Sequence, residues 1–486
     1  MSEDIWRRDR AIAVVHEADY IVGKFRDENI PVGYATNDDG DILYMYVKGQ
    51  LLTRDQFLGG VAGPEPRREA GTQRPKGVLD VLEGASIPGY PAEIQIDRVI
   101  RDVVRINLPG INNVPNEDPL SVPNLLLTIE RELGAGFATP DHVLTAATGP
   151  MGPCPATEPQ EVYGPWQPYP ARCPGDGGAG VRIYVADTGL LKDAADEFPW
   201  LQGVKGELDP RSGPGDAIQP YDGHGTFVAG VIRCLAPKAE IYVASVFDIA
   251  GSAVESDIAI RLNGALAHGA EIIHMTIASP SRNNVPMMAI QAWLEQLTAY
   301  KGVVCIAAAG NNGNRLPCWP AAFDQVISVG ALAADWCSRA YFSNFGGWVD
   351  VYAPGQNLVN AYATGTYTCV TAPFVDEKRT FSGMTQWSGT SFSTPIVTGL
   401  IATRMSRCDE NGPEAVAALL AEARARVVPG VGPVLLPCCD DGERCRGDRR
   451  GCGCGAQRCG CGGERCGCGG ERGSCGCGQH HHRMPR

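Results

Sequence analysis

Five short runs of apolar residues between positions 181 and 332 constrain the fold of this chain most strongly. They read VRIYVAD, EIYVASVF, AEIIHMTIA, GVVCIAAAG and QVISVGAL, and they are rich in valine, isoleucine and alanine. Segments with helical spacing of apolar residues, such as residues 256–269 and 287–297, lie between some of them. Buried strands that alternate with helices indicate a parallel sheet covered on both faces. We therefore predict a three-layer α/β domain over residues 181–430.

The residues before this domain divide into two parts. Residues 1–147 contain a helical pattern at 121–134 and a turn that leads into a strand at 35–49, which predicts a small α+β domain. Residues 148–180 carry many prolines and glycines, a composition that excludes a continuous helix or a central strand. We interpret this second part as a linker.

The tail, residues 438–486, has a different composition. Glycine and cysteine dominate it, RCGCGGE repeats at 458–464 and 465–471, and 11 of the chain's 19 cysteines lie there. Such a segment cannot bury an apolar core, so we predict that it is disordered without a ligand. Its Cys-x-Cys pairs and His480–His482 suit a soft metal such as zinc or copper(I), but the spacing differs from that of structural zinc sites. A metal-free low-complexity extension therefore stays an equal alternative.

Charge and hydropathy restrict the partners of the chain. The formal net charge is −13, which argues against a general nucleic-acid binder, because phosphate contacts need a basic surface. No stretch reaches the length of a membrane span, and the longest apolar run near the start, residues 11–15, is too short for a signal sequence. We expect a monomeric, cytoplasmic protein without membrane insertion; a misassigned start codon would leave secretion open.

Three residues with the chemistry of a nucleophilic site lie at the ends of predicted strands or at the starts of helices. Asp187 closes the first apolar run, His224 lies between two glycines at the start of an apolar segment, and Ser391 is the second residue of the helix-like segment TSFSTPIVTG. A serine hydroxyl becomes a nucleophile only beside a base, and the base needs an orienting group. Alone, Ser391 would be read as a helix cap and His224 as a structural histidine.

A fourth residue completes this set. Asn311 follows the buried strand GVVCIAAAG, so its side-chain amide lies just beyond a strand end. Together with the backbone N–H of Ser391 at a helix start, that amide can hold a developing oxyanion. An ordinary turn residue is the simpler interpretation of Asn311 by itself.

These motifs resemble those of the subtilisin-like serine peptidases. DTG, HGT, AAGNNG and GTSFSTP stand in the chain order Asp, His, Ser, with separations of 37 and 167 residues between the three. The resemblance covers about residues 160–430. It implies that Asp187 orients the base, that His224 is the general base, and that Ser391 is the nucleophile and, with Asn311, the oxyanion donor.

The resemblance also implies where substrate binds. HMTIASP resembles the segment that pairs with the substrate backbone, and it assigns this role to Thr276, Ile277 and Ala278. Ala278 stands where relatives commonly have glycine, which adds a methyl group beside the groove. Ala309 and Gly310 belong to the wall of the first specificity pocket by the same resemblance. No complete calcium ligand set is recognisable, and we assign no metal site to the α/β domain.

We therefore expect a serine endopeptidase that hydrolyses a protein or peptide substrate without a cofactor. The resemblance suggests that residues 1–147 are an inhibitory prodomain and that the chain cuts itself between residues 145 and 180. A regulatory or substrate-recognition domain is the alternative for residues 1–147. For the whole chain, the alternative is an inactive peptidase fold whose cysteine-rich tail binds a metal or a partner.

Overall fold

The computed structural model describes residues 18–38, 40–59, 76–146, 156–165, 167–209, 217–247, 250–371 and 373–437. The chain divides into two compact units, Met1–Pro437 and Cys438–Arg486. The second unit lies outside the described residues, and with it the predictions of disorder and of soft-metal binding. The segment 147–155, most of which belongs to the predicted linker, lies outside them as well.

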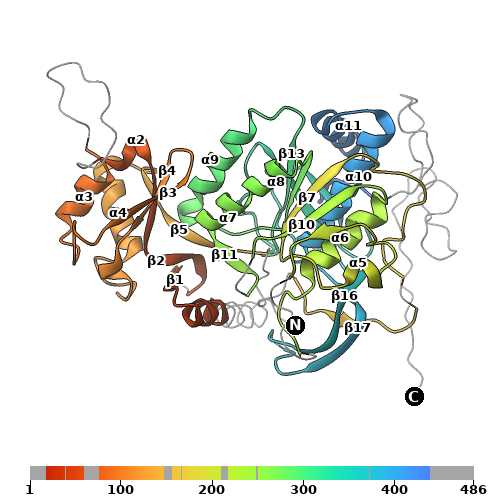
Figure 1. Ribbon diagram of the computed structural model, residues 1–486, viewed down its shortest axis with the longest axis horizontal. Coiled ribbons are helices and arrows are strands. Elements are labelled where there is room, and N and C mark those ends of the chain that lie inside the picture. Colours follow the sequence, from red (N-terminus) through yellow and green to blue (C-terminus); the bar gives the residue numbers. More distant parts are fainter. Residues whose placement is uncertain are drawn as a thin grey trace. The chain divides into compact units, whose positions relative to one another are not determined.

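A seven-stranded parallel sheet forms the centre of the first unit (Figure 1). Its order is β15 (Val351–Pro354), β14 (Val326–Leu332), β13 (Val304–Ala308), β12 (Ile272–Met275), β7 (Arg182–Asp187), β10 (Glu240–Ser245) and β8 (Lys205–Gly206). The five apolar runs supply the inner strands. The outer strands β8 and β15 have two and four residues, which is too short for a clear periodicity in the sequence.

Alternation along β7 shows how the sheet separates two cores. Ile183 and Val185 belong to one buried cluster, whereas Tyr184 and Ala186 belong to another. Successive side chains of a strand point to opposite faces, so a central strand that is apolar throughout needs a cover on each side. A fully buried valine or isoleucine side chain contributes about 1.5–3 kcal/mol to the free energy of unfolding. The predicted three-layer parallel α/β fold is confirmed.

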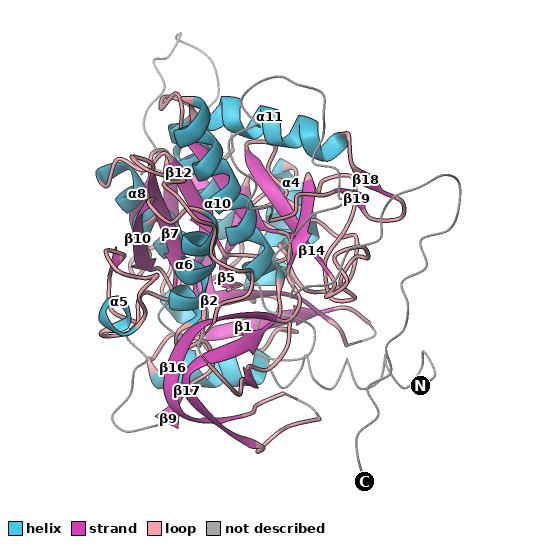
Figure 2. Cartoon of the chain, turned by 90° about the vertical axis from the view of Figure 1, so that its right-hand side faces the viewer, coloured by secondary structure: helices cyan, strands magenta, loops and turns pink. Residues whose placement is uncertain are grey.

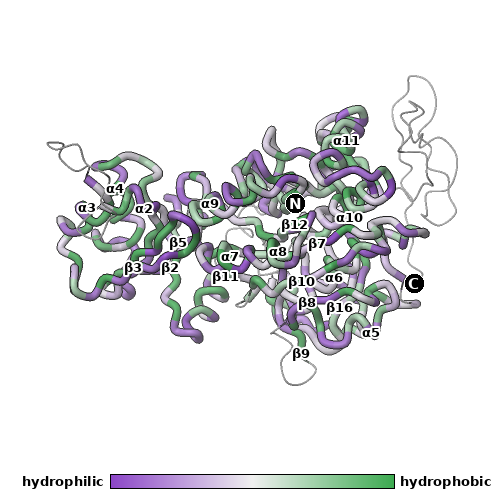
Figure 3. Tube along the Cα trace, turned by 45° about the horizontal axis from the view of Figure 1, so that its top comes forward, coloured by the Kyte–Doolittle hydropathy of each residue, from purple (hydrophilic) through white to green (hydrophobic). Residues whose placement is uncertain are grey.

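The two layers of helices come from different parts of the chain. One face packs against α6 (His224–Leu235) and α10 (Thr390–Cys408), with α11 (Gly412–Arg424) behind α10 (Figure 2). The other face carries α7 (Glu255–Arg261), α8 (Asn263–Ala267) and α9 (Met288–Leu297). The hydropathy of these segments can be followed along the chain in Figure 3.

The N-terminal residues form an α+β arrangement around an antiparallel sheet. Its strands are β1 (Val32–Thr36), β2 (Ile42–Arg54), β3 (Gln95–Ile100), β4 (Val103–Asn107) and β5 (Ala138–Thr145). The helices α2 (Asp55–Leu58), α3 (Val78–Gly84), α4 (Val122–Leu133) and the turn η1 (Pro109–Ile111) accompany them. The chain at 18–27 is helical as well.

This antiparallel sheet continues into the α/β part. β11 (Ser252–Val254) pairs with β5, so one sheet has the order β11-β5-β2-β4-β3, with β1 beside β2. Leu52, Ile100 and Val103 lie in the same buried cluster as residues of α7 and α9. Salt bridges from Arg54 to Glu295 and from Arg282 to Glu130 join the two parts as well. The described part of residues 18–146 and the α/β part therefore share a core.

A long hairpin lies beside the α/β sheet. β16 (Leu358–Thr368) and β17 (Lys378–Trp387) pair with each other and with the short strands β6 (Gln160–Glu161) and β9 (Ala217–Ile218). Other short elements are α5 (Ala194–Glu197), η2 (Arg282–Asn284) and the pair β18 (Val427–Val428) and β19 (Gly432–Pro433).

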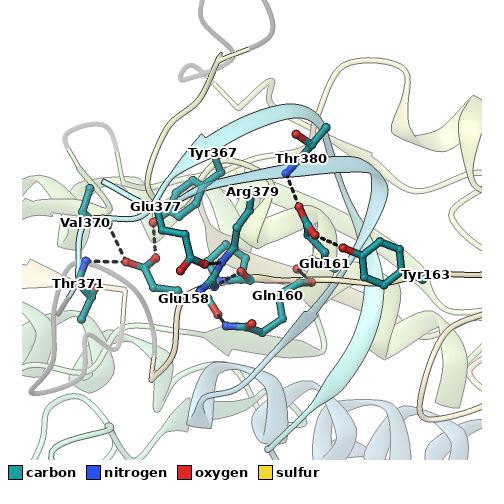
Figure 4. A network of polar contacts seen from close by, with 12 residues as sticks. Glu158, Gln160, Glu161, Tyr163, Tyr367, Val370, Thr371, Glu377, Arg379 and Thr380 are labelled. Atoms are coloured by element: carbon teal, nitrogen blue, oxygen red, sulfur yellow. Dashed lines mark hydrogen bonds and ion pairs between the residues drawn. The ribbon is translucent and has the colours of Figure 1, made fainter. Parts of the chain in front are cut away.

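Glu158 fixes the start of the chain that follows residue 155 to this hairpin. Its Oε1 accepts the N–H groups of Val370 and Thr371 at 2.8 and 2.7 Å, and its Oε2 accepts the Tyr367 hydroxyl at 2.5 Å (Figure 4). Trp387 Nε1 donates to the carbonyl of Thr157 at 2.7 Å. Part of the predicted linker is therefore integrated into the fold.

The described cysteines are mainly core residues. Cys234 and Cys305 are buried free thiols, and burial raises the pKa of each to about 12, so both stay protonated at neutral pH. Cys173 and Cys408 are both disulfide-bonded. Among the described residues, no helix is both long enough and apolar enough to span a membrane.

Candidate active site

The three residues predicted to be catalytic lie on three different elements. Asp187 is the last residue of β7, His224 is the first residue of α6, and Ser391 is the second residue of α10. The ring of Phe392 lies 5.2 Å from the ring of His224 between centroids, so the first turn of α10 packs against the histidine. The side chains of Asp187, His224 and Ser391 are all completely buried.

His224 is held by Asp187 in one defined orientation. Its Nδ1 donates to Asp187 Oδ1 at 2.8 Å. Because a carboxylate only accepts hydrogen bonds, this bond places the proton of the neutral ring on Nδ1 and leaves Nε2 as the basic nitrogen. His224 Nε2 and Ser391 Oγ are both buried, and neither makes a hydrogen bond within the described residues. A catalytic role is one of the explanations for a buried polar atom without a partner.

Asp187 is stabilised as an anion although it is buried. Its Oδ1 also accepts the backbone N–H of Thr188 at 2.7 Å, and its Oδ2 accepts the hydroxyl of Thr276 at 2.7 Å. Burial by itself would raise the pKa of this carboxyl, but the charge of His224 and these hydrogen bonds lower the pKa below its usual value. The carboxylate is therefore ionised at neutral pH and can stabilise a protonated His224.

Aromatic side chains surround the imidazole of His224. The rings of Tyr221 and Trp387 lie 5.8 and 5.6 Å from it between centroids, both in edge-to-face geometry. Phe392 closes a third side. This apolar surrounding excludes water from the ring and strengthens its interaction with Asp187, because electrostatic interactions grow as the local dielectric falls.

Asn311 is oriented by the start of α10. Its Oδ1 accepts both the N–H and the hydroxyl of Thr390, at 2.8 and 2.9 Å. Since the carbonyl end of the amide is fixed in this way, the NH₂ end is the donor that faces away from Thr390. Thr390 Oγ1 also accepts the N–H of Gly310 at 3.1 Å, which ties the loop after β13 to the residue before Ser391.

The predicted substrate-binding residues have separate environments. Thr276 points to Asp187, Ile277 is fully buried in the core beneath the helices, and Ala278 donates its N–H to the carbonyl of Thr145 at 3.2 Å. Ala309 is buried. Gly310 has φ +95°, and a Cβ there would lie 2.6 Å from the amide of Asn344. The substrate-binding role of these five residues stays a prediction.

Two contacts that matter here were not predicted from the sequence. The Thr276 side chain was assigned to the groove, whereas its hydroxyl supports the carboxylate of Asp187. Glu255, the first residue of α7, binds His142 of β5 at 2.7 Å. No periodicity marks either contact, because each joins segments more than 80 residues apart in the sequence.

This geometry defines a class of proteins, namely α/β proteins with an Asp–His–Ser site at the ends of parallel strands. A comparison with protein families gives the particular family: the model described as "Subtilase family" matches residues 178–443. The match covers more than half of the chain, and the chain belongs to the subtilase family.

Curated relatives align over different shares of their length. M-protease from Shouchella clausii (strain KSM-K16) is 31% identical over 239 residues, which is 46% of this chain and 54% of the relative. The chain thus spans about half the length of that relative. The Thermophilic serine proteinase from Bacillus sp. (strain AK1) is 29% identical over 378 residues, which is 72% of this chain and 84% of the relative.

The chain is also similar to solved structures. The structure titled "Structure of self-cleaved protease domain of PatA" aligns with 24% identity and a TM-score of 0.40, and it covers 52% of this chain and 91% of that chain. At this TM-score the alignment adds nothing to the family match.

Thr276→Val should lower kcat of peptide hydrolysis by about tenfold or more, since a hydrogen bond to a charged group contributes about 1.5–3 kcal/mol. KM should stay nearly constant, because the hydroxyl binds Asp187. Thr276→Ser should restore most of kcat, and Thr364→Val, at an exposed position of β16, is the matched control. A rise in KM at constant kcat would contradict this positioning role.

Asn311→Ala should lower kcat by about 10²–10³-fold, the usual cost of one oxyanion donor. Steady-state kinetics on a fluorogenic peptide measure this loss. Asn312→Ala, one residue further along the same loop, is the control. Equal kinetics for the two variants would remove Asn311 from the oxyanion site.

Proposed function

We propose that the chain is a serine endopeptidase that uses Asp187, His224 and Ser391. The observation that carries this proposal is the 2.8 Å hydrogen bond from His224 to Asp187, next to a buried Nε2 and a buried Ser391 Oγ that lack hydrogen bonds within the described residues. Membership in the subtilase family agrees with it. The substrate is a protein or peptide.

In the first half of the reaction, Ser391 Oγ attacks the carbonyl carbon of a peptide bond while its proton passes to His224 Nε2. Asp187 stabilises the imidazolium that results. The N–H of Ser391 and the amide of Asn311 hold the negative oxygen of the tetrahedral intermediate. When the C–N bond breaks, His224 gives the proton to the leaving amine, and an acyl-enzyme remains.

In the second half, a water molecule attacks the acyl-enzyme and transfers its proton to His224. The tetrahedral intermediate then breaks at the Ser391 ester bond, the proton returns to Ser391 Oγ, and the carboxylic acid product leaves. Every proton that moves is accounted for by His224, so the chemistry needs no cofactor.

We propose further that the chain cuts itself after the N-terminal region. Ala146 donates its N–H to the carbonyl of Gly251 at 2.8 Å, and Tyr221 lies against both Gly251 and His224. Ala156 donates its N–H to the carbonyl of Ser388, three residues before Ser391. The chain is therefore fixed on the His224 side at Ala146 and near Ser391 at Ala156, which favours cleavage between these two residues.

The location of the protein stays a prediction. Disulfide bonds such as those of Cys173 and Cys408 are typical of oxidising compartments, whereas the sequence favoured a cytoplasmic location. The monomeric state and the absence of nucleic-acid binding also remain predictions from composition.

Ser391→Ala should abolish both labelling by a fluorophosphonate probe and self-cleavage, because each needs the Ser391 hydroxyl as nucleophile. Gel electrophoresis with N-terminal sequencing of wild type should show a new terminus between residues 147 and 156. Ser382→Ala, at an exposed position of β17, is the control and should behave as wild type. Probe labelling that survives in Ser391→Ala would refute the assignment.

The hold on the N-terminal region should weaken as pH rises, because Asp141 is buried between β5 and α7. Ser256 donates its N–H and hydroxyl to Asp141, and burial, with the nearby charge of Glu255, raises the pKa of this carboxyl to about 8 despite Arg105. Once released into water, the carboxyl would have a pKa of about 3.9. Docking therefore takes up a proton above pH 4, and its free energy becomes less favourable as pH rises towards 8.

Dissociation of the N-terminal fragment from the cut protein, measured at pH 6.5 and pH 9, tests this expectation. Wild type should dissociate more readily at pH 9, and Asp141→Asn, which cannot ionise, should show a much smaller difference. The same pH dependence in both proteins would exclude Asp141 as its source.

A further inference from the structure

The C-terminal end of β5, residues 143–145, lies between two segments of the α/β part. On one edge it pairs antiparallel with β11, with Thr145 opposite Ser252 and Val143 opposite Val254. The other edge pairs with β2 as far as His142, and beyond β2 Thr145 accepts the N–H of Ala278 at 3.2 Å and donates its own N–H to Ser279 Oγ at 2.9 Å. An extended chain that pairs through its backbone on both edges is bound in the manner of β-strand addition.

The direction of β5 relates it to the catalytic residues. Thr145 lies opposite residues 278 and 279, and the Nε2 of His142 accepts the N–H of Arg282 at 3.2 Å, so β5 runs antiparallel to residues 278–282. Continued toward its C-terminal end, it approaches Thr276, which binds Asp187. The chain at β5 therefore runs toward the triad with its carboxyl side leading, as the acyl part of a substrate must.

Alternate side chains of β5 then enter the α/β part. Leu144 and Ala146 are fully buried, in the same cluster as Tyr221, Ala253 and Ile277. The backbone of Ala146 lies against Gly251, and Tyr221 fills the space beside it. A Cβ added at Gly251 would lie 2.4 Å from the Tyr221 ring. This position accepts a small side chain, whereas the position two residues earlier accepts a large aliphatic one.

Two residues before Leu144, the surroundings of the side chain change from apolar to polar. His142 Nδ1 donates to Glu255 Oε2 at 2.7 Å, and both side chains are buried. Glu255 Oε1 accepts the N–H of Ala289 at 2.6 Å, so among the described residues the α/β part binds this carboxylate through one of its two oxygens. Burial of a carboxylate is costly without a partner, and here the partner of the second oxygen comes from the N-terminal region.

We infer that Glu255 is a specificity-determining residue of the peptidase. Once β5 has left, its carboxylate selects peptides with a basic side chain (His, Lys or Arg) two residues before a large aliphatic residue and four residues before a small one. The pattern is that of His142, Leu144 and Ala146 themselves. This inference rests on the proposed peptidase function and extends it to the substrate class.

The test uses internally quenched peptides with the sequence of residues 140–152, PDHVLTAATGPMG, and the full chain cut between residues 146 and 156. The cut is made by the chain itself or by an unrelated protease at an inserted site, and the N-terminal fragment is removed. Replacing the peptide's His by Glu should lower kcat/KM by about tenfold or more, because two carboxylates would meet at Glu255. Replacing it by Lys should change kcat/KM little.

The apolar position gives a second measurement on the same enzyme. Replacing the peptide's Leu by Ala should lower kcat/KM by about 10–100-fold, which corresponds to the burial of one leucine side chain. Mass spectrometry locates the cut bond in each peptide, so a change in register would be seen directly.

Variants of the enzyme assign the charge preference to one residue. Glu255→Gln should reduce the preference for His over Glu at least severalfold, whereas Glu240→Gln, at an exposed position of β10, should keep it. If Glu255→Gln does not fold, the peptide series on the wild-type enzyme still tests the inference, because it needs no variant of the enzyme. Fluorophosphonate labelling, run in parallel, tests the peptidase function separately from the specificity role of Glu255.

Equal kcat/KM for the His and Glu peptides, with labelling intact, would overturn the specificity inference alone. Loss of both labelling and hydrolysis in wild type would refute the peptidase function and the inference with it.

Discussion

The buried carboxylate of Asp187 is the interaction on which the site depends. In a completely buried position an unpaired carboxylate would be costly, and here three donors compensate for lost water: His224, Thr188 and Thr276. These donors come from α6, from the residue after β7 and from the residue after β12. The carboxylate therefore both orients the imidazole and joins three elements at one edge of the sheet.

The same edge also receives a strand from the N-terminal region. β5 belongs to an antiparallel sheet, and through β11 that sheet extends into the α/β part. A strand with open edges offers rows of backbone donors and acceptors, which a groove of complementary backbone can satisfy. In the proposed function this groove binds the substrate, and β5 of the chain itself lies there. Glu255 places a carboxylate beside this strand. Among the contacts described, its Oε1 binds the N–H of Ala289 and its Oε2 binds His142 of β5.

Much of the fold followed from local pattern. The apolar runs at 181–187, 240–247, 270–278, 302–310 and 325–332 became the inner strands β7, β10, β12, β13 and β14, because a strand buried on both faces must be apolar at every position. The short strands β8 and β11 were not predicted, since two or three residues carry no period. Pairing with β10 and β5, rather than composition, makes them strands.

The chemical groups of the site could be read from the sequence: a carboxylate at a strand end, a histidine and a serine at helix starts, and an asparagine after a strand. These are properties of residue type and local position, so they can be read in chain order. The folded chain was needed to show that Thr276 supports Asp187, that Asn311 is oriented by Thr390, and that His142 meets Glu255. Each of these contacts joins residues 79 or more positions apart, and their partners are set by strand register and helix packing, which no local pattern encodes.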